Sequence, residues 1–368
     1  MEYQIKYENG IANHGNLYRL KKVMDRAKAG EPLNIAFLGG SITQGSLSTK
    51  PELCYAYHVY EWWKKTDFTY INAGIGGTTS QFGVARAEDD LLSKEPDFVI
   101  IEFSVNDEST EHFMETYEGL VRKVYTSKTK PAVLLVHNVF YNNGGNAQLM
   151  HGRIARHYDL PAVSMQSTIY PEVVSGHIEN RDITPDDLHP NDAGHALVAS
   201  VITYFLDKVK TEDATEQSEP DYPTPLTKNT YEKSIRHQNS DENVVCHGFV
   251  ADTSAQRDIT DCFKHGWTAS KKGDSITLDV EGCNISVQYR KSVKLPAPVA
   301  EIIVDGETDH AVRLDANFDE TWGDKLELDT ILEHGENKVH KVEVRLVETH
   351  EDDAVPFYLV SVIGSSEK

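Results

Sequence analysis

A serine that follows two glycines is the first group in this sequence with the features of a nucleophile. It is Ser41, within the segment Leu38–Gly45 (LGGSITQG). Glycines let the backbone turn sharply, so the serine can project its hydroxyl into a crevice while the following N–H groups face an anion. A phosphate-binding turn or a helix cap would use the same residues, so this segment alone does not settle its chemistry.

A later segment supplies a base and an acid. In Asp186–Asn191 (DDLHPN), Asp186 and His189 are three positions apart, and on a compact turn the carboxylate can reach one ring nitrogen. That hydrogen bond would fix the imidazole tautomer and leave the other nitrogen to accept a proton from a serine. A histidine that caps the following helix is the alternative, and Asp187 is a second candidate for the acid.

Two intervening segments could stabilise a developing negative charge. The segments Asn72–Ser80 (NAGIGGTTS) and Phe103–Asp107 (FSVND) offer glycine N–H groups and the Asn106 carboxamide, which are donors suited to an oxyanion. Each segment alone could be an ordinary turn. Because all four occur in one chain and supply nucleophile, base, orienting acid and oxyanion donors, their combination indicates a site for nucleophilic acyl transfer.

The four segments lie at the ends of expected strands or at the starts of expected helices. Apolar runs alternate with helical patterns through the first 210 residues, which predicts a doubly wound α/β domain with a parallel sheet. Ligands of such sheets bind beyond the carboxyl ends of the strands, where the four segments would meet. The expected strands are residues 34–38, 69–72, 98–103, 132–137 and 161–165, and the expected helices are residues 17–29, 56–65, 81–93, 113–125, 147–158 and 193–208.

The pattern changes after residue 210. Residues 211–234 are acidic, contain prolines and lack apolar periodicity, which indicates a linker or a surface crossing. Residues 235–368 contain short alternating strands separated by turn residues, which favours an antiparallel β-sandwich. We therefore expect a domain over 1–210, a linker over 211–234 and a sandwich domain over 235–368. The clearest strands of the sandwich are residues 275–280, 284–289, 300–304, 339–346 and 357–363.

The formal net charge of the 368-residue chain is −22. This charge repels phosphates and anionic lipids, so we expect neither nucleic acid nor a membrane as partner. The four cysteines form no close pair, which signals neither a zinc site nor a redox motif, so we expect no metal or cofactor. The start, MEYQIKYENG, has no basic or apolar part of a secretory signal, and we expect a cytoplasmic location.

The four segments resemble those of the SGNH hydrolases, also called GDSL-like esterases, over about residues 34–208. The resemblance implies a flavodoxin-like, three-layer α/β/α domain that works without a cofactor. It also implies that Ser41 is the nucleophile, that His189 is the general base and that Asp186 orients the base.

The same resemblance implies an oxyanion hole. Its donors would be the N–H groups of Ser41 and Gly77 and the side chain of Asn106, with Gly76 as the alternative to Gly77. Two features depart from the family pattern: the first segment has GGSIT where GDSL is usual, and Ser104 stands where many members have glycine. Neither departure removes a member of the implied triad.

The GGSIT version, together with a C-terminal sandwich, resembles carbohydrate esterase family 17. Members of that family remove acetyl groups from mannan and manno-oligosaccharides, and they pair the esterase with a domain like a family 35 carbohydrate-binding module, here jelly-roll-like. The C-terminal resemblance covers about residues 235–368 and depends on the strand pattern and on Phe263–Trp267 (FKHGW). It implies an acetylated oligosaccharide as substrate. Gly40, Gly76 and Trp267 are candidate contacts, although Trp267 could equally be a core residue of the sandwich.

Two other functions remain open from the sequence. One is an SGNH esterase or thioesterase that acts on a non-carbohydrate short-chain acyl ester, and the other is a sugar-binding protein with an inactive esterase domain. The intact set of Ser41, Asp186 and His189 argues against the second. Trp62 and Trp63 could pave a sugar site, but their place in an expected amphipathic helix favours core packing.

The Ser41→Ala variant is expected to fold normally and to lose nearly all hydrolysis of an activated ester such as p-nitrophenyl acetate, because it lacks the attacking oxygen. The measurement is the steady-state rate beside a circular dichroism spectrum. A variant with wild-type activity would exclude the serine mechanism. We also expect the rate of hydrolysis to fall as the pH is lowered, with a midpoint near the ordinary histidine pKa of about 6.5.

Overall fold

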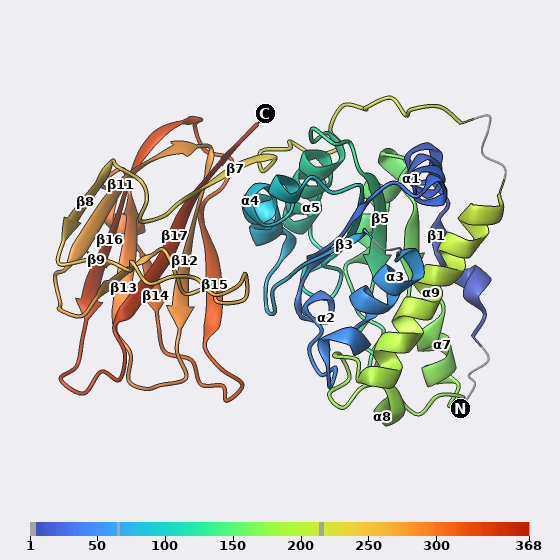
Figure 1. The fold of residues 1–368 in the computed structure, drawn as a ribbon. Coiled ribbons are helices and arrows are strands. Elements are labelled where there is room, and N and C mark those ends of the chain that lie inside the picture. The colour runs from blue at the N-terminus through green and yellow to red at the C-terminus, as the bar shows by residue number, and fades with distance from the viewer. Residues whose placement is uncertain (1–4, 65–66, 213–216, 368) are drawn as a thin grey trace. The chain divides into compact units, whose positions relative to one another are not determined.

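The computed structural model describes residues 5–64, 67–212 and 217–367. It divides into two compact units, Met1–Asn229 and Thr230–Lys368 (Figure 1). Residues 1–4 at the start of the chain, residue 65 in the second expected helix and residues 213–216 in the expected linker lie outside the described residues. Within the described ranges, no helix is long and apolar enough to cross a membrane.

A six-stranded sheet forms the centre of the first unit. Its spatial order is β1-β6-β5-β4-β2-β3, in which β2 to β6 are parallel and the short β1 is antiparallel to β6. Without β1, this is the flavodoxin-like strand order, so the predicted doubly wound α/β fold is confirmed. The strands are β1 (Ile11–Asn13), β2 (Asn34–Gly39), β3 (Thr69–Gly74), β4 (Phe98–Glu102), β5 (Ala132–His137) and β6 (Ala162–Ser164).

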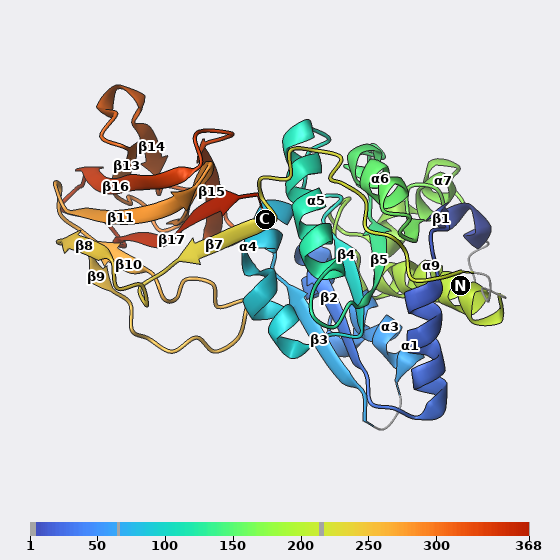
Figure 2. The same cartoon turned by 90° about the horizontal axis from the view of Figure 1, so that it is seen from above.

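Helices cover both faces of this sheet (Figure 2). The helices α1, α3 and α9 pack together on one face, and α4, α5 and α6 pack together on the other. Every residue of β4 and β5 is buried, as expected for strands covered on both sides. The helices are α1 (Tyr18–Ala29), α2 (Ser41–Gln44), α3 (Tyr55–Trp63), α4 (Ser80–Asp90), α5 (Glu111–Tyr125), α6 (Gln148–His157), α7 (Ile169–Val174), α8 (Asn180–Ile183) and α9 (Asp192–Thr211), with 3-10 turns η1 (Tyr7–Gly10), η2 (Pro51–Leu53) and η3 (Leu92–Lys94).

Local signals in the sequence explain where several of these helices begin and end. The side chain of Asn191 caps α9 by accepting the Gly194 N–H, and Thr110 caps α5 in the same way. Helix α1 ends at Gly30, whose φ of +83° suits glycine. The five expected strands correspond to β2–β6, and the six expected helices correspond to α1, α3, α4, α5, α6 and α9 with ends shifted by a few residues.

The described part of the expected linker, residues 217–229, runs along the first unit. The carboxylate of Glu118 on α5 accepts hydrogen bonds from the N–H groups of Leu226 and Thr227, and Arg122 donates to the carbonyl of Pro223. These hydrogen bonds hold residues 217–229 against the surface of the first unit.

The second unit consists of two antiparallel sheets that enclose one apolar core (Figure 1). One sheet has the order β15-β12-β17-β10-β9, with β7 also paired to β17, and the other has the order β14-β13-β16-β11-β8. The predicted antiparallel sandwich is therefore confirmed. Its elements are β7 (Lys233–His237), β8 (Val244–His247), β9 (Val250–Ala251), β10 (Trp267–Ala269), β11 (Ser275–Gly282), β12 (Asn284–Lys291), β13 (Val299–Val304), η4 (Thr308–His310), β14 (Val312–Asp315), β15 (Lys325–Leu332), β16 (Lys338–Glu348) and β17 (Phe357–Ser366).

Two buried histidines make the stability of the first unit sensitive to acid. Burial lowers the pKa of His137 to about 3 and that of His195 to about 4, whereas the ordinary value is about 6.5. Between these values the unfolded chain binds protons that the folded chain does not. Stability is therefore complete above about pH 6.5 and is lost as the pH falls, by about 1.4 kcal/mol per pH unit for each histidine.

The His137→Leu variant is expected to lose less stability on acidification than the wild type, by about 1.4 kcal/mol per pH unit between pH 6.5 and 4.5. Neither ring nitrogen of His137 has a hydrogen-bond partner among the described residues, so leucine removes the titrating group without breaking a hydrogen bond. Urea unfolding at the two pH values measures the difference. The exposed His247, replaced by leucine in the second unit, is the control, and equal acid sensitivity of His137→Leu and wild type would contradict the assignment.

Candidate active site

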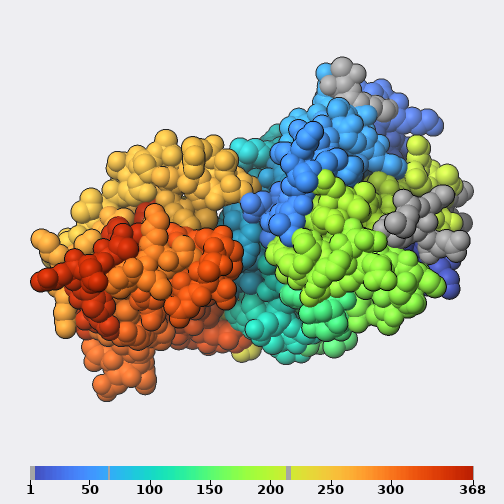
Figure 3. All heavy atoms as spheres, turned by 90° about the horizontal axis from the view of Figure 1, so that it is seen from below, coloured from blue at the N-terminus to red at the C-terminus, as the bar shows by residue number. Residues whose placement is uncertain are grey.

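Ser41 is the first residue of helix α2, directly after strand β2 and its N-cap Gly40. His189 and Asp186 lie on the loop between α8 and α9. In the space-filling view of Figure 3, the blue segment that follows β2 and the yellow-green segment that leads into α9 lie side by side. Both segments belong to the carboxyl-terminal edge of the parallel sheet, so the fold brings together residues that are 148 positions apart.

These three side chains form a continuous hydrogen-bonded chain. Ser41 Oγ lies 2.8 Å from His189 Nε2, and His189 Nδ1 lies 2.6 Å from Asp186 Oδ2. Because the carboxylate can only accept, Nδ1 carries the proton and Nε2 is left to accept the serine hydroxyl. The arrangement is that of a nucleophile, a general base and an orienting acid.

The loop around Asp186 fixes its orientation and its charge. Its Oδ1 accepts hydrogen bonds from the N–H groups of Leu188 and His189, at 3.1 and 2.7 Å. Partial burial alone would raise the pKa of Asp186, but the hydrogen bonds from the ring and backbone of His189 and from the Leu188 N–H outweigh it, and the pKa is lowered. Asp186 is therefore ionised at neutral pH, as an orienting acid must be.

Asp187, the second candidate for the acid, is engaged elsewhere. Its carboxylate accepts a hydrogen bond from Asn180 and forms an ion pair with Arg181. Its φ of +72° directs the chain through the turn. The geometry thus separates the two aspartates, one facing the histidine and the other bracing the loop.

The Asn106 amide lies next to the nucleophile. A Cβ atom on Gly40 would stand only 2.2 Å from Asn106 Oδ1, so a glycine is required for Asn106 to pack against the turn before Ser41. Asn106 is half-buried, and its buried Oδ1 atom has no hydrogen-bond partner within the described part of the chain. An oxyanion would need the Nδ2 group of Asn106, because Oδ1 can only accept a hydrogen bond, so the role of Asn106 as an oxyanion donor stays a prediction.

The two adjacent glycines have different environments. The Gly76 N–H donates to Gln44 Oε1 at 2.6 Å, so it is already occupied. Gly77 has φ +68°, and the space that a Cβ would occupy there is open. The occupied N–H of Gly76 leaves Gly77 as the preferred prediction for the oxyanion donor, although Gly76 lies nearer to the nucleophile: a Cβ on Gly76 would stand 3.5 Å from Ser41 Cβ. Sequence reasoning missed Gln44, because only the folded chain places it against the glycine loop.

The last residue of the Phe103–Asp107 segment, Asp107, has two structural partners. Asp107 caps α4 by accepting the Ser80 N–H at 2.9 Å, and its other oxygen lies 3.0 Å from His151 Nε2. Both of these side chains are fully buried. Asp107 thus holds the loop that carries Asn106 in place.

Of the three tryptophans considered for sugar contacts, Trp63 and Trp267 are buried in a core, and Trp62 is half-buried. Trp267 is only 2% exposed and belongs to the sandwich core, so the expectation that it touches substrate is corrected: its ring has no face open to a ligand. Trp63 is buried in the core of the first unit, and the indole N–H of Trp62 donates to Asp207. Of the three candidate contacts, Gly40 and Gly76 lie next to Ser41.

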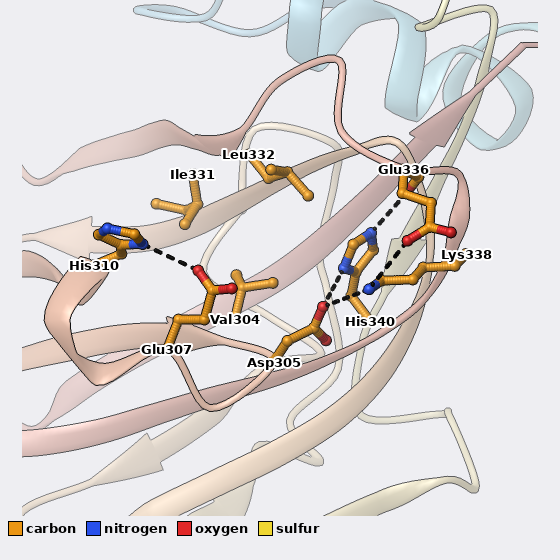
Figure 4. A pocket seen from close by; sticks show the side chains of 9 residues that line it. All are labelled: Val304, Asp305, Glu307, His310, Ile331, Leu332, Glu336, Lys338 and His340. Atoms are coloured by element: carbon orange, nitrogen blue, oxygen red, sulfur yellow. Dashed lines mark hydrogen bonds and ion pairs between the residues drawn. The ribbon is translucent and has the colours of Figure 1, made fainter.

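The second unit has a separate concavity of about 380 Å³. Figure 4 shows its polar wall, in which Asp305 binds both Lys338 and His340, opposite a Glu307–His310 pair. Val304, Ile331 and Leu332 form its apolar part. It contains no serine or cysteine that could act as nucleophile. Among the described residues of the whole chain, no group of His, Cys, Asp or Glu is arranged to hold a metal ion.

Comparisons with known proteins agree with this geometry. The model of the GDSL-like Lipase/Acylhydrolase family matches residues 37–197. The crystal structure of a two-domain esterase (CEX) active on acetylated mannans is 94% identical, with a TM-score of 0.98 over 99% of this chain and 100% of that one. The same type of esterase co-crystallised with mannopentaose is 93% identical, with a TM-score of 0.97 over 100% and 99% of the two chains. An acetylxylan esterase of Geobacillus stearothermophilus is 25% identical over 158 residues, 35% of this chain and 68% of that protein.

Replacing either aspartate by asparagine tests which one serves the histidine. Asp186→Asn is expected to lower kcat by about 10⁴-fold, because the amide no longer holds the required tautomer. Asp187→Asn, its matched neighbour, is expected to change kcat by less than about threefold, since it only weakens a loop contact of the kind worth about 1 kcal/mol or less. Steady-state rates with p-nitrophenyl acetate decide the matter, and the reverse ranking would make Asp187 the acid.

Proposed function

This chain belongs to the GDSL-like lipase/acylhydrolase family and is a carboxylic ester hydrolase, and we propose that it removes O-acetyl groups from acetylated mannan and manno-oligosaccharides. The observation that carries the proposal is the hydrogen-bonded chain from Ser41 through His189 to Asp186. It occurs in a protein 94% identical, along almost its entire length, to an esterase active on acetylated mannans.

In the proposed first half-reaction, Ser41 Oγ attacks the acetyl carbonyl carbon while His189 Nε2 accepts the hydroxyl proton. The carbonyl π electrons move to oxygen, and the resulting oxyanion is bound by the N–H groups of Ser41 and Gly77 and by the Asn106 amide. Each such donor can stabilise the transition state by about 3 kcal/mol. The protonated His189 then gives its proton to the sugar oxygen as the C–O bond breaks, and acetyl-Ser41 remains.

In the second half-reaction, water replaces the sugar. His189 Nε2 accepts a proton from the water, whose oxygen attacks the acetyl-serine carbonyl through the same oxyanion site. Collapse of the intermediate releases acetate and returns the proton to Ser41 Oγ. Throughout the cycle the negative charge of Asp186 stabilises the imidazolium, at the 2.6 Å contact with Nδ1.

A neutral carbohydrate suits the electrostatics of the chain. With a net charge of −22, long-range attraction of anionic lipid surfaces or nucleic acid is unfavourable. The 93% identical esterase that was co-crystallised with mannopentaose supports an oligosaccharide as the ligand. We also propose that the second unit is carbohydrate-binding-module-like, since the matching esterase has two domains and is aligned with this chain along its length.

We also propose a cytoplasmic location and an active rather than a disabled esterase. The four cysteines are free thiols, two of them buried, which supports a reducing, cytoplasmic environment, where disulfides seldom form. The sugar-binding alternative requires a disabled triad, whereas the hydrogen bonds of Ser41, His189 and Asp186 are intact.

Product analysis on a panel of acetylated manno- and xylo-oligosaccharides and simple acyl esters tests the substrate. We expect acetate release to be fastest from manno-oligosaccharides and negligible from long-chain esters, because the net-negative surface gives no attraction to a lipid interface. The Ser41→Ala variant measures the background release of acetate. Turnover of p-nitrophenyl acetate without release from any acetylated sugar would favour another short acyl ester, and no turnover of either would favour a non-enzymatic sugar-binding protein.

A further inference from the structure

A buried group of three polar side chains lies against the helix that carries Ser41. Thr43 is fully buried, two residues after the nucleophile, and its Oγ1 is 2.8 Å from Tyr55 Oη. The same Oγ1 donates to Glu102 Oε2 at 3.3 Å. Glu102 is the last residue of β4 and is also fully buried. Helix α2 is therefore hydrogen-bonded both to the neighbouring strand and to α3.

Gly39 makes this close approach possible. A Cβ on Gly39 would stand 2.2 Å from Thr43 Oγ1 and 2.5 Å from the carbonyl oxygen of Glu102. Any larger residue would push α2 away from the end of β4. The strand that leads to the nucleophile thus ends in a residue small enough to let the threonine reach the glutamate.

Burial of these three polar side chains costs free energy, and the fold alone does not require it. Burying a carboxyl and two hydroxyl groups costs several kcal/mol unless hydrogen bonds compensate. Apolar side chains of similar shape often stabilise a core equally well or better. What a hydrogen-bonded group adds is a fixed geometry, since its members must keep both distance and direction. The position of this group indicates which element needs that fixed geometry.

Hydrogen bonds connect Tyr55 of this group to the helix that follows His189. The Tyr55 N–H donates to His195 Nδ1, and His195 Nε2 donates to the Ser46 carbonyl, both at 3.2 Å. The Tyr55 and His195 rings are stacked with centroids 6.4 Å apart. His195 lies in the first turns of α9, which begins three residues after His189. The elements that carry nucleophile and base are therefore linked through Tyr55.

We propose that Glu102, acting through Thr43, is a positioning residue that holds Ser41 in reach of His189 and of the oxyanion donors. The inference rests on the proposed serine mechanism and adds to it a determinant that does not touch substrate. A shift of about 1 Å at reacting atoms can cost on the order of a hundredfold in rate, so a support for the short α2 turn has a measurable effect on kcat.

The protonation of Glu102 makes a conservative variant informative. Burial and, to a lesser degree, the nearby Asp107 raise the pKa of Glu102, the hydrogen bonds from the Thr43 side chain and the Ser104 N–H lower it, and the net result is a pKa of about 7. The other ionisable groups around it include Tyr55 and Tyr117, as well as Arg86, which donates to the Gly39 carbonyl. At pH 6 Glu102 is therefore mostly an uncharged carboxyl group, which glutamine resembles in shape and hydrogen bonding.

The test compares kcat and KM for p-nitrophenyl acetate at pH 6 in four variants. Thr43→Val and Glu102→Leu are expected to lower kcat ten- to a hundredfold, on the order of the cost of a displaced nucleophile, with KM changed by less than about twofold. Glu102→Gln is expected to keep kcat within about threefold of wild type, because it retains the hydrogen bond to Thr43. Tyr55→Phe, which keeps the ring but removes the hydroxyl, is expected to lower kcat less than Thr43→Val does.

Thr168→Val is the matched control. Thr168 is buried to the same degree and donates one hydrogen bond, to the Ser164 carbonyl, away from α2. Thermal unfolding of every variant separates loss of fold from loss of rate. If Thr43→Val does not fold, the contrast between Glu102→Gln and Glu102→Leu and the effect of Tyr55→Phe carry the test.

Three results would overturn the proposal: a wild-type kcat in the folded Thr43→Val or Glu102→Leu variant, an equal loss in Thr168→Val, or a Glu102→Gln variant as slow as Glu102→Leu. The rate of Ser41 phosphonylation by a small activated phosphonate gives the same ranking without any sugar. If acetylated mannan is not cleaved but this ranking holds, the substrate proposal fails and the positioning role stands.

Discussion

The 2.8 Å contact between Ser41 Oγ and His189 Nε2 is the interaction on which the rest of the site depends. The two residues are 148 positions apart, and neither lies in a long element whose packing would fix it alone. Ser41 occupies the first turn of a four-residue helix, and His189 occupies a loop. A parallel sheet solves this problem because all of its carboxyl ends meet at one edge, and each loop that leaves the edge is anchored by a buried strand.

Polar side chains hold the residues of this contact in position. Asp186 holds the imidazole from one side through the ring nitrogen and the backbone of its own loop. Beneath the serine, the buried Thr43 joins α2 to β4 and α3, and Asp107 fixes the loop that presents Asn106. Such buried groups cost free energy to desolvate, and hydrogen bonds offset that cost only in one arrangement. The same feature that makes them poor stabilisers makes them good determinants of geometry.

Much of the fold follows from local sequence signals. Continuous apolar runs place β2 to β6, and caps such as Asn191 and Gly30 place helix ends. The short β1 was not predicted, because three residues that pair antiparallel at a sheet edge leave no periodic signal. The sandwich was predicted from alternation, but Trp267 was misplaced, since one aromatic residue in a strand looks the same whether it faces core or solvent.

Some residues of the site could likewise be predicted from the sequence, and others could not. Residue type and chain order identified Ser41, Asp186, His189 and Asn106 as a set that the fold brings to one edge. The sequence favoured Gly77 over Gly76 only by alignment, and it could not show that Gln44 binds the Gly76 N–H. It gave no sign of Glu102, which depends on a contact across 59 positions. Trapping the reaction intermediate tests the central claim most directly: acid quenching during turnover of an acetyl ester, followed by peptide mass spectrometry. The account predicts an acetyl group on Ser41 during turnover; acetylation of another residue, or steady turnover with no acetyl-enzyme under conditions where deacylation limits the rate, would contradict it.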